Sequence, residues 1–465
     1  CKARGPCPML DLNISSYEFL KQLIEQKRLV PFSVHQAFVF KHVIDERPII
    51  RLSSYLPTCW KTVRQMKQWN QIFEENEDFA QLRKYTIDSK ELTNMTDLTP
   101  LQYTMLGYYM LLNYMEDHNL NILADGGTVK QFFAHSTRGA LVSIRNNEMQ
   151  IPEESVTTLD INSFYPFCLS QIDVGIGLPN SITQKHTLND VMRLVNDGAV
   201  VFLECEYTYK RLHELDKPYN HKLVLTNYDI KSGNYIIDAT KPMRGFYWSN
   251  EKVAHQPFAE YVNKLYAVRL QNKNMKTALN AAIGMLIHKW KPTTTRKTSH
   301  NNDRIITNPC FLHERNGKEV WTNAVDYVYN FTPLHSLILS YAHYYLQTTI
   351  FKHCIQNNIP MLYTSTDSLT IYSKDLPKLS QYMHASTLGK MKIEAEGDNA
   401  IFKTRGLYYI NPSKYSSLNV PHQAIETYCE DAKISIHTFF KQLAAGKTFH
   451  DLHHNNRTYT LRGVA

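Results

Sequence analysis

Two aspartates stand where the sequence predicts rigid backbone, and together they could hold divalent cations. Asp160 lies near the end of residues 156–161, a β-branched and apolar run that is typical of a buried strand. Asp367 lies in MLYTSTDSLTIYS (residues 361–373), where two apolar runs around Ser-Thr-Asp-Ser predict a β-hairpin with the aspartate at its turn. Two ions held about 4 Å apart by shared carboxylates would activate a hydroxyl and stabilise the charge of phosphoryl transfer. The simpler interpretation of each aspartate alone is a helix cap or a turn former.

A row of basic and amide side chains lies between the two aspartates in the sequence. Its members are separated by four, three and four residues, so on a single helix they would share one face; they are Arg269, Lys273, Lys276 and Asn280. Such a face suits a triphosphate, because cations there neutralise negative charge and hold a leaving pyrophosphate. The alternative interpretation is an ordinary solvated basic face.

The elements that would position these residues are mostly predicted helices. They are expected at residues 16–27, at 162–170, from Pro257 toward His288, from Pro333 onward and at 435–445, with a strand pair at 400–410. The chain's last residues, with His450, His453 and His454, look polar and irregular. A solvated tail is favoured over a metal site there, because no carboxylate or thiolate is spaced to complete one.

Composition and charge bound the class of protein. The 465 residues are 43% hydrophobic and 12% aromatic, enough for a large core and two or more subdomains. With 51 Lys and Arg against 43 Asp and Glu, the formal charge is +8 and favours polyanionic partners. The alternative at this point is an ordinary basic soluble protein.

The cysteines and the apolar runs bear on the compartment. The eight cysteines are scattered without a close C-x-x-C pair, so a reducing compartment is the simpler interpretation. The sequence contains no run of about eighteen apolar residues, so no membrane-spanning helix is predicted. The start CKARGPCPML lacks the apolar core of a secretory signal. Because the sequence begins with Cys rather than Met, we expect a fragment or a processed product.

Three motifs occur in the order that family B DNA polymerases have. DINSFYP (160–166) resembles the D-x-x-S-L-Y-P motif of that family, KTALNAAIG (276–284) resembles K-x-x-x-N-S-x-Y-G, and TSTDS (364–368) resembles x-D-T-D-S. Weaker likenesses agree with these: TRGA (137–140) with Y-x-G-G, LGKMKIE (388–394) with G-K-x-K-x-E, and GLYY (406–409) with the K-x-Y primer contact. VLTNYDI, GFYWSNE and FAEYVNKLYAVR resemble the organellar and viral, protein-primed branch.

The resemblance implies roles for the residues of these motifs. Asp160 and Asp367 would be the catalytic metal ligands, with the carbonyl of Ile161 as a further oxygen ligand, for two Mg²⁺ ions or for Mn²⁺. Tyr165 would lie under the incoming sugar and exclude a 2′-hydroxyl, although core packing is an equally ordinary role for a Tyr in an apolar helix. The residues implied for nucleotide binding are Tyr165, Arg269, Lys273, Lys276 and Asn280.

The same resemblance implies the partners. Primer-template DNA, deoxynucleoside triphosphates and a terminal protein primer are the expected partners, and no membrane is expected. The residues implied for DNA binding are Arg138, Gly139, Lys390, Lys392, Arg405 and Tyr408. The expected location is intracellular, in a mitochondrion that carries a linear plasmid or in the host cell of a virus.

The implied fold is α+β, a right-hand polymerase fold with an antiparallel-sheet palm, helical fingers and a small thumb. The expected division is a remnant of an exonuclease-like region at 1–130, palm at 131–190 and 291–409, a protein-primed-type insertion at 191–250, fingers at 251–290 and a partial thumb at 410–465. No exonuclease activity is predicted. Where the exonuclease pattern needs an Asp four residues after a Tyr, Tyr103 is followed by Gly107.

Three departures from the family pattern concern the active site itself. Ser365 stands at the first Asp of D-T-D, which removes one negative charge beside Asp367; strand alternation could place both on one face. Ala281 and Ile283 replace the usual Ser and Tyr. Only six residues separate Arg269 from Lys276, so the fingers would be short, with residues 271–274 as the turn.

Three hypotheses remain open on these grounds. The first is an active DNA-directed DNA polymerase, and the second is a degenerate relative that only binds DNA. The third is a basic structural or RNA-binding protein that matches by accident. Retention of Asp160, Asp367, Tyr165 and Lys276 argues against the third.

Overall fold

The computed structural model describes residues 81–123, 129–177, 179–216, 223–287, 295–296, 309–315, 318–323, 331–455 and 457–463. These residues form helices and strands whose ladders run antiparallel, so the predicted α+β class is confirmed. The helix predicted at 16–27 and most of the remnant proposed at 1–130 lie outside the described residues.

One five-stranded sheet carries both aspartates, with the strand order β1-β14-β15-β2-β16. The strand predicted for Asp160 is β2 (Val156–Ile161), and the predicted hairpin of Asp367 is β14 (Met361–Ser365) with β15 (Ser368–Tyr372). The outer strands are β1 (Val142–Ile144) and β16 (Met391–Gly397). β2 is buried except at Asp160, because VTTLDI supplies β-branched and apolar side chains to both faces of a covered sheet.

Helices pack beside this sheet in one continuous core. They are α5 (Pro100–Asp117), α6 (Val129–Ala134), α7 (Phe164–Gln171), α10 (Ala259–Gln271), α11 (Met275–Met285) and α12 (Thr332–Tyr345). α5 begins with a capping box between Thr99 and Gln102 and with Pro100 in its first turn, which satisfies backbone amides that a helix start leaves unpaired. As predicted, α12 also has its proline in the first turn. It continues as a π-helical stretch (Leu346–Phe351) and α13 (Lys352–Gln356).

The helical stretch predicted from Pro257 toward His288 is two helices rather than one. Between α10 and α11 the chain turns at 272–274, close to the turn proposed at 271–274. The buried Asn272 holds this turn, because its Nδ2 donates to the carbonyls of Leu92 (3.0 Å) and Met95 (2.7 Å) and its Oδ1 accepts from the amide of Asn274 (3.1 Å). A side chain that bonds to backbone in this way competes with helix continuation.

A separate small sheet with its own helices lies at 180–248, which overlaps the insertion predicted at 191–250. We call these elements the insertion, and their assignment to the protein-primed type stays a prediction. Alternate residues of its strand β5 (Val200–Glu204) face two cores: Phe202 packs into the main core and Val201 and Leu203 into a second one. Its sheet has the order β4-β9-β5-β7, and β6 pairs with β8. The bounds are β4 (Asn180–Ile182), α8 (Leu188–Asn196), β6 (Tyr207–Tyr209), β7 (Val224–Thr226), α9 (Asn227–Ser232), β8 (Tyr235–Ile237) and β9 (Arg244–Trp248).

The C-terminal elements form a lobe with a further core. They are β17 (Ile401–Thr404), β18 (Leu407–Asn411), β19 (Lys414–Ser417), α14 (His422–Asp431), α15 (Ile436–Ala444), β20 (Phe449–His454) and β21 (Arg457–Leu461). The predicted strand pair at 400–410 and the helix at 435–445 are confirmed.

The polar tail predicted around His450, His453 and His454 is wrong, because these residues belong to the hairpin β20–β21. Phe449 and Leu452 are fully buried against α14 and α15, and the Phe449 ring stacks on Phe439 with centroids 4.0 Å apart. An irregularity between Phe449 and Leu452 lets residues three apart face inward, which hides the period-two pattern in the sequence.

The remaining described elements are short. They are β3 (Val174–Gly175), β10 (Val253–Ala254), β11 (Thr295–Arg296), β12 (Pro309–Arg315), β13 (Lys318–Asn323) and single-turn helices such as Gln81–Lys84 and Lys90–Thr93. Among the described residues, no helix combines the length and the apolar character that a membrane crossing needs.

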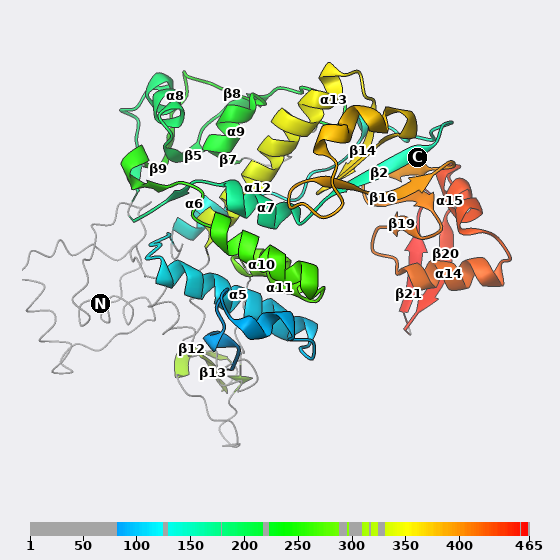
Figure 1. Cartoon of the computed structure of the whole chain (residues 1–465), viewed down its shortest axis with the longest axis horizontal. Coiled ribbons are helices and arrows are strands. Elements are labelled where there is room, and N and C mark those ends of the chain that lie inside the picture. Colours follow the sequence, from blue (N-terminus) through cyan, green and yellow to red (C-terminus); the bar gives the residue numbers. More distant parts are fainter. Residues whose placement is uncertain are drawn as a thin grey trace, which may run out of the picture.

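Figure 1 shows the insertion and the C-terminal lobe at opposite ends of the molecule, with the central sheet and its helices between them. α5 runs alongside α11, and their closest approach is backbone to backbone. A Cβ at Gly107 would lie 2.0 Å from the carbonyl oxygen of Ala278, a distance that real atoms do not reach. The position of α11, and therefore of Lys276 and Asn280, depends on this glycine.

We expect Gly107→Ala to destabilise the protein by about 1–3 kcal/mol or more, because the two helix backbones must separate. The free energy of unfolding from urea titrations measures this loss. Gly284→Ala on α11 is the matched control: a Cβ there meets no atom within 4 Å, and alanine favours a helix by about 1 kcal/mol over glycine. Equal stability of the two variants would contradict the close contact.

Candidate active site

The turn that carries Asp367 joins β14 to β15 by two residues. Thr366 has a φ of 62°, and the amide of Asp367 donates to the carbonyl of Ser365 (2.8 Å). The turn is also bonded to the neighbouring strand, since the carbonyl of Asp367 accepts from the amide of Ile161 (2.8 Å). This bond fixes the aspartate beside the end of β2.

Asp160 is in β2, an inner strand of the five that lies between β15 and β16. Its Cα partners are Ser368 on β15 and Lys392 on β16. Because cross-strand partners project to the same face, Lys392 reaches the carboxylate, with 3.0 Å between Nζ and Oδ2. The Asp160 side chain is 19% exposed, so it lies at the edge of the core and within reach of solvent.

The electrostatics of Asp367 show that the two aspartates are neighbours. Burial raises the pKa of Asp367 to about 6, the Asp160 charge adds to the rise, and Glu394 adds a smaller part. The Lys276 charge lowers the same pKa, so α11 brings its lysine toward the carboxyl pair. Two carboxylates at close range disfavour joint ionisation unless a cation lies between them.

Glu394 is a residue of this site that the sequence reasoning did not select. It occupies the irregularity in the pairing of β16 with β2 between Ile393 and Ala395, so strand alternation alone would not have placed it. Lys414 binds it at 2.6 Å. The signal in the sequence was the last residue of LGKMKIE, which we assigned only to the DNA-binding stretch.

The donor set fits Mg²⁺ or Mn²⁺ in its chemistry. Asp160 and Asp367 supply hard oxygen ligands. Ile161, whose carbonyl is the third expected ligand, ends β2, and its amide donates to the Asp367 carbonyl. Across the ranges that the structure describes, no group of three or more His, Cys, Asp and Glu side chains is placed to hold a metal ion. Mg²⁺ is ordinarily bound by one or two carboxylates together with water and substrate phosphates, so the pair fits an ion that arrives with a nucleotide.

Arg269 reaches the helix that follows Asp160. Its guanidinium donates to the hydroxyl of Ser163 and lies over the ring of Tyr266, 5.1 Å from the centroid. Ser163 has a φ of 47°, an uncommon conformation outside glycine, and it leads directly into α7. Tyr165, on the first turn of α7, is half-buried and packs against the main core.

The predicted single face of basic residues is wrong as a helix stripe, because the turn at Asn272 separates its members. Arg269 is on α10, Lys273 is in the turn, and Lys276 and Asn280 are on α11. The last two are four residues apart and share a helix face, and both are exposed. The structure brings Lys276 toward Asp367, and Arg269 toward Ser163.

Ser365 is the last residue of β14, and Thr366 and Asp367 form the turn that follows it. Because Thr366 adopts a left-handed conformation, strand alternation does not extend from Ser365 to Asp367. Burial raises the pKa of Tyr363, and hydrogen bonds with the Gly406 amide and the Ser365 side chain oppose the rise. Ser365 and Tyr363 thus share one face of β14, and the Ser365 hydroxyl is bonded to the Tyr363 side chain.

Three of the residues predicted to contact DNA lie in or beside the strands β16, β17 and β18. Lys390 precedes β16, and its Nζ donates to the carbonyl of Gln381 (2.9 Å). Arg405 is in the turn between β17 and β18, and Tyr408 on β18 packs against Tyr363, with ring centroids 5.1 Å apart. The Tyr363 hydroxyl accepts from the Gly406 amide (2.9 Å). This bond ties the Arg405 turn to the strand that leads to Asp367.

Arg138 does not support the DNA contact predicted for it. Its side chain is 1% exposed and forms a bidentate ion pair with Asp229 of α9. A guanidinium held in the interior by two bonds cannot reach a phosphate backbone without breaking them. Gly139, the next residue, is exposed, and its predicted role stays a prediction.

No family model and no curated protein matches this sequence. Solved structures do. Phi29 DNA polymerase, complexed with primer-template DNA and incoming nucleotide substrates, is 14% identical with a TM-score of 0.50, and the match covers 74% of this chain and 63% of that one. The binary complex of Phi29 DNA polymerase with primer-template DNA matches with the same identity and TM-score, over 73% of this chain and 63% of that one.

The chain thus spans less than two thirds of the length of the polymerase it resembles. At 14% identity the likeness bears on architecture alone. The mixed helices and antiparallel sheets described above resemble the fold of Phi29 DNA polymerase.

Proposed function

We propose that this protein is a DNA-directed DNA polymerase that adds deoxynucleotides to a 3′-hydroxyl by two-metal catalysis. The observation that carries the proposal is the position of Asp160, near the end of β2, beside the Asp367 turn, where the Ile161 amide donates to the Asp367 carbonyl (2.8 Å). The effects of the Asp160 and Lys276 charges on the pKa of Asp367 agree with this position. The fold shared with a polymerase whose structures hold primer-template DNA and nucleotide supports the same conclusion. The motifs DINSFYP and TSTDS agree with it.

Each residue of the site has a role that its position supports. Asp160, Asp367 and the carbonyl of Ile161 would hold two divalent ions, which would activate the primer's 3′-hydroxyl and stabilise the charge of the transferred phosphoryl group. Lys276 would bind the triphosphate, with Asn280 on the same helix, Lys273 in the turn and Arg269 on α10. Lys392 would leave Asp160 as the ions bind, because one carboxylate cannot serve both partners fully.

Other parts of the proposal rest on the resemblance of the sequence. They are a palm at 131–190 and 291–409, fingers at 251–290, a small thumb at 410–465, DNA contacts from Lys390, Arg405 and Tyr408, and priming by a terminal protein on a linear plasmid or viral genome. A mitochondrial or virus-infected host compartment follows from the same proposal.

Asp160→Asn and Asp367→Asn should each abolish primer extension, by at least about a thousandfold, because each removes a metal-binding charge. DNA affinity should stay within about threefold, since the substitutions preserve side-chain shape. Single-turnover extension and fluorescence anisotropy measure the two quantities. Asp375→Asn is the control, because Asp375 is paired with Lys378 away from the site. Extension at an undiminished rate in either site variant would sink the assignment.

The pH dependence should follow the raised pKa of Asp367, about 6, whose first cause is burial and whose second is Asp160. Protons and metal compete for this carboxylate, so at limiting Mg²⁺ the extension rate should rise from pH 5 to 7. Without metal, the bound proton stabilises the native state below pH 4, and this contribution is lost as the pH rises through 6. Urea titrations at each pH measure the free energy of unfolding, and Asp367→Asn should remove its loss between pH 4 and 6. An unchanged dependence of this free energy on pH would refute the raised pKa of Asp367.

Tyr165→Val should raise ribonucleotide incorporation relative to deoxyribonucleotide by about tenfold or more, if the ring excludes a 2′-hydroxyl. The ratio of kcat/KM for paired nucleotides measures this selectivity. Tyr165→Phe keeps the ring and should retain discrimination. If Val and Phe give the same ratio as the natural residue, Tyr165 serves packing instead.

A second candidate, a relative that binds DNA without efficient catalysis, is favoured by Ser365. With Ser there the site has one carboxylate fewer, so we expect weak extension that prefers Mn²⁺ over Mg²⁺. Ser365→Asp should lower the metal concentration for half-maximal rate by several fold.

A substitution at Glu394 tests the opposite change, the removal of a carboxylate near Asp367. Because its charge already acts on Asp367, Glu394→Gln should raise the metal requirement, and Ser365→Asp should restore part of the loss in the double variant. If Ser365→Asp stays inactive with every metal while folded and DNA-bound, the binding-only function is preferred. Full activity of the natural protein at low Mg²⁺, undiminished in Glu394→Gln, would show that neither position limits the site.

A further inference from the structure

The segment 135–141, which precedes β1, is bonded directly to the turn of Asp367. The carbonyl of Leu141 accepts from the amide of Thr366 at 2.7 Å. Thr366 is the residue with left-handed backbone in that turn. The turn therefore has two backbone supports: Ile161, on β2, and Leu141, at the end of this segment. A shift of the segment would move the turn.

The insertion holds the middle of the segment through Arg138 and Asp229. The two side chains are 1% and 3% exposed and share two hydrogen bonds. Asp229 is itself fixed at the start of α9, because its carboxylate accepts from the amide (2.7 Å) and the hydroxyl (3.0 Å) of Thr226. The pair thus ties the segment to a capped helix terminus.

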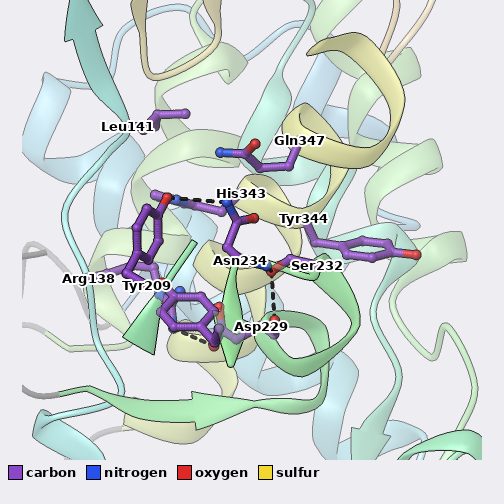
Figure 2. Close-up of a pocket in the computed structure, with 10 residues that line it drawn as sticks. Arg138, Leu141, Tyr209, Asp229, Ser232, Asn234, His343, Tyr344 and Gln347 are labelled. Carbon is purple, nitrogen blue, oxygen red and sulfur yellow. Dashed lines mark hydrogen bonds and ion pairs between the residues drawn. The ribbon is translucent and has the colours of Figure 1, made fainter. Parts of the chain in front are cut away.

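Helix α12 supports the segment on both sides of Arg138, at Ser136 and at Gly139. The hydroxyl of Ser136 donates to that of Ser336 at 2.7 Å. Burial, with the Arg138 charge, lowers the pKa of His343 to about 4, so the imidazole is neutral at pH 7 and its Nε2 donates to the carbonyl of Gly139 (3.2 Å). Figure 2 shows Arg138, Leu141, Asp229 and His343 around one pocket between the insertion and α12.

A buried ion pair adds little to the free energy of unfolding by itself. Its charges lose their hydration, and an apolar replacement of similar shape is often as stable. What the pair does supply is a defined geometry, because two parallel bonds between planar groups fix both distance and orientation. Here the ion pair fixes Arg138, and Leu141, three residues later, is bonded to the backbone of the Asp367 turn.

We propose that Arg138 is a positioning residue, which through its pair with Asp229 holds the Asp367 turn in register with the end of β2. The inference rests on the proposed function in that the turn's position matters for catalysis. The claim that a remote ion pair controls the position of the turn does not depend on the proposed catalytic function. Arg138 then acts on the reaction without touching nucleotide or DNA.

The test replaces the ion pair by an amide pair of similar shape, Arg138→Gln with Asp229→Asn, which avoids leaving one charge buried alone. The first readout is hydrogen exchange in peptides covering residues 361–372, which contain the Thr366 amide. We expect exchange there to accelerate about tenfold or more as the support loosens. Peptides from β20–β21 should be unchanged, which shows that the fold is intact.

The second readout is kinetic. A misplaced turn should lower kcat about tenfold and raise the metal requirement, while KM for nucleotide and Kd for primer-template stay within about twofold. Arg138→Lys keeps the charge without the two-bond fork and should fall between the natural protein and the double variant. A purely structural role would not split kcat from KM in this way.

The matched control is a second ion pair of the insertion, Arg244 with Glu204 between β9 and β5. Arg244→Gln with Glu204→Gln removes the same two charges without touching the segment 135–141. Exchange at 361–372 should stay as in the natural protein. Equal acceleration in this control would overturn the proposal, because any loosening of the insertion would then suffice.

The outcomes separate the two claims. Unchanged exchange at 361–372 in the Arg138 and Asp229 double variant overturns the positioning role, whatever the activity. Accelerated exchange in a protein whose natural form never extends a primer supports the positioning role and refutes the proposed function. Weaker DNA binding with unchanged exchange would return Arg138 to the direct DNA contact first predicted for it.

Discussion

The structure depends on keeping two carboxylates close together against their mutual repulsion. Asp160 and Asp367 come from different strands, and the bond from the Ile161 amide to the Asp367 carbonyl sets their approach. The raised pKa of Asp367, caused first by burial and then by Asp160, reflects the cost of that approach. A cation would remove that cost, as in the metal site that we propose for this pair.

Most other features of the core keep that pair in place. The strand of Asp160 is covered by neighbours on both sides, β15 and β16, and its buried residues leave little freedom. The helices α5 and α11 meet at Gly107, which brings Lys276 toward the carboxyl pair. Positive charge thus arrives from a helix, and negative charge from the sheet. The two elements can be positioned independently, which suits a site that must admit a third, polyanionic component.

Local patterns in the sequence predicted much of this arrangement. The strand at 156–161 and the hairpin at 361–373 followed from runs of β-branched residues and from the turn residues Ser-Thr-Asp-Ser, whose effects are local. The break between α10 and α11 could be located only through the motif spacing, because Asn272 stops the helix by bonding to Leu92 and Met95, far away in sequence. The hairpin at Phe449 was missed because an irregular register broke the alternation.

The site residues also differ in whether the sequence could reveal them. Asp160, Asp367 and Lys276 lie together as expected, but Glu394 projects from an irregular pairing that no period-two pattern reveals. Arg138 was assigned to DNA because its neighbours resemble a DNA-contacting motif. Its burial with Asp229 depends on α9, which is some ninety positions further along the chain. Sequence patterns identify residues that act through neighbours in the chain, and they fail where a partner arrives by tertiary folding.

The pairing of β2 with a strand on each side has a consequence for how such a chain can change in length. A single inserted or deleted residue in β2 would turn Asp160 to the opposite face of the sheet and would also break its register with both neighbours. The hairpin β20–β21 belongs to a lobe with its own core and holds no residue of the carboxyl pair. Length variation among related chains should therefore accumulate at that distant end and in the connections around the insertion, while the spacing within β2 stays invariant.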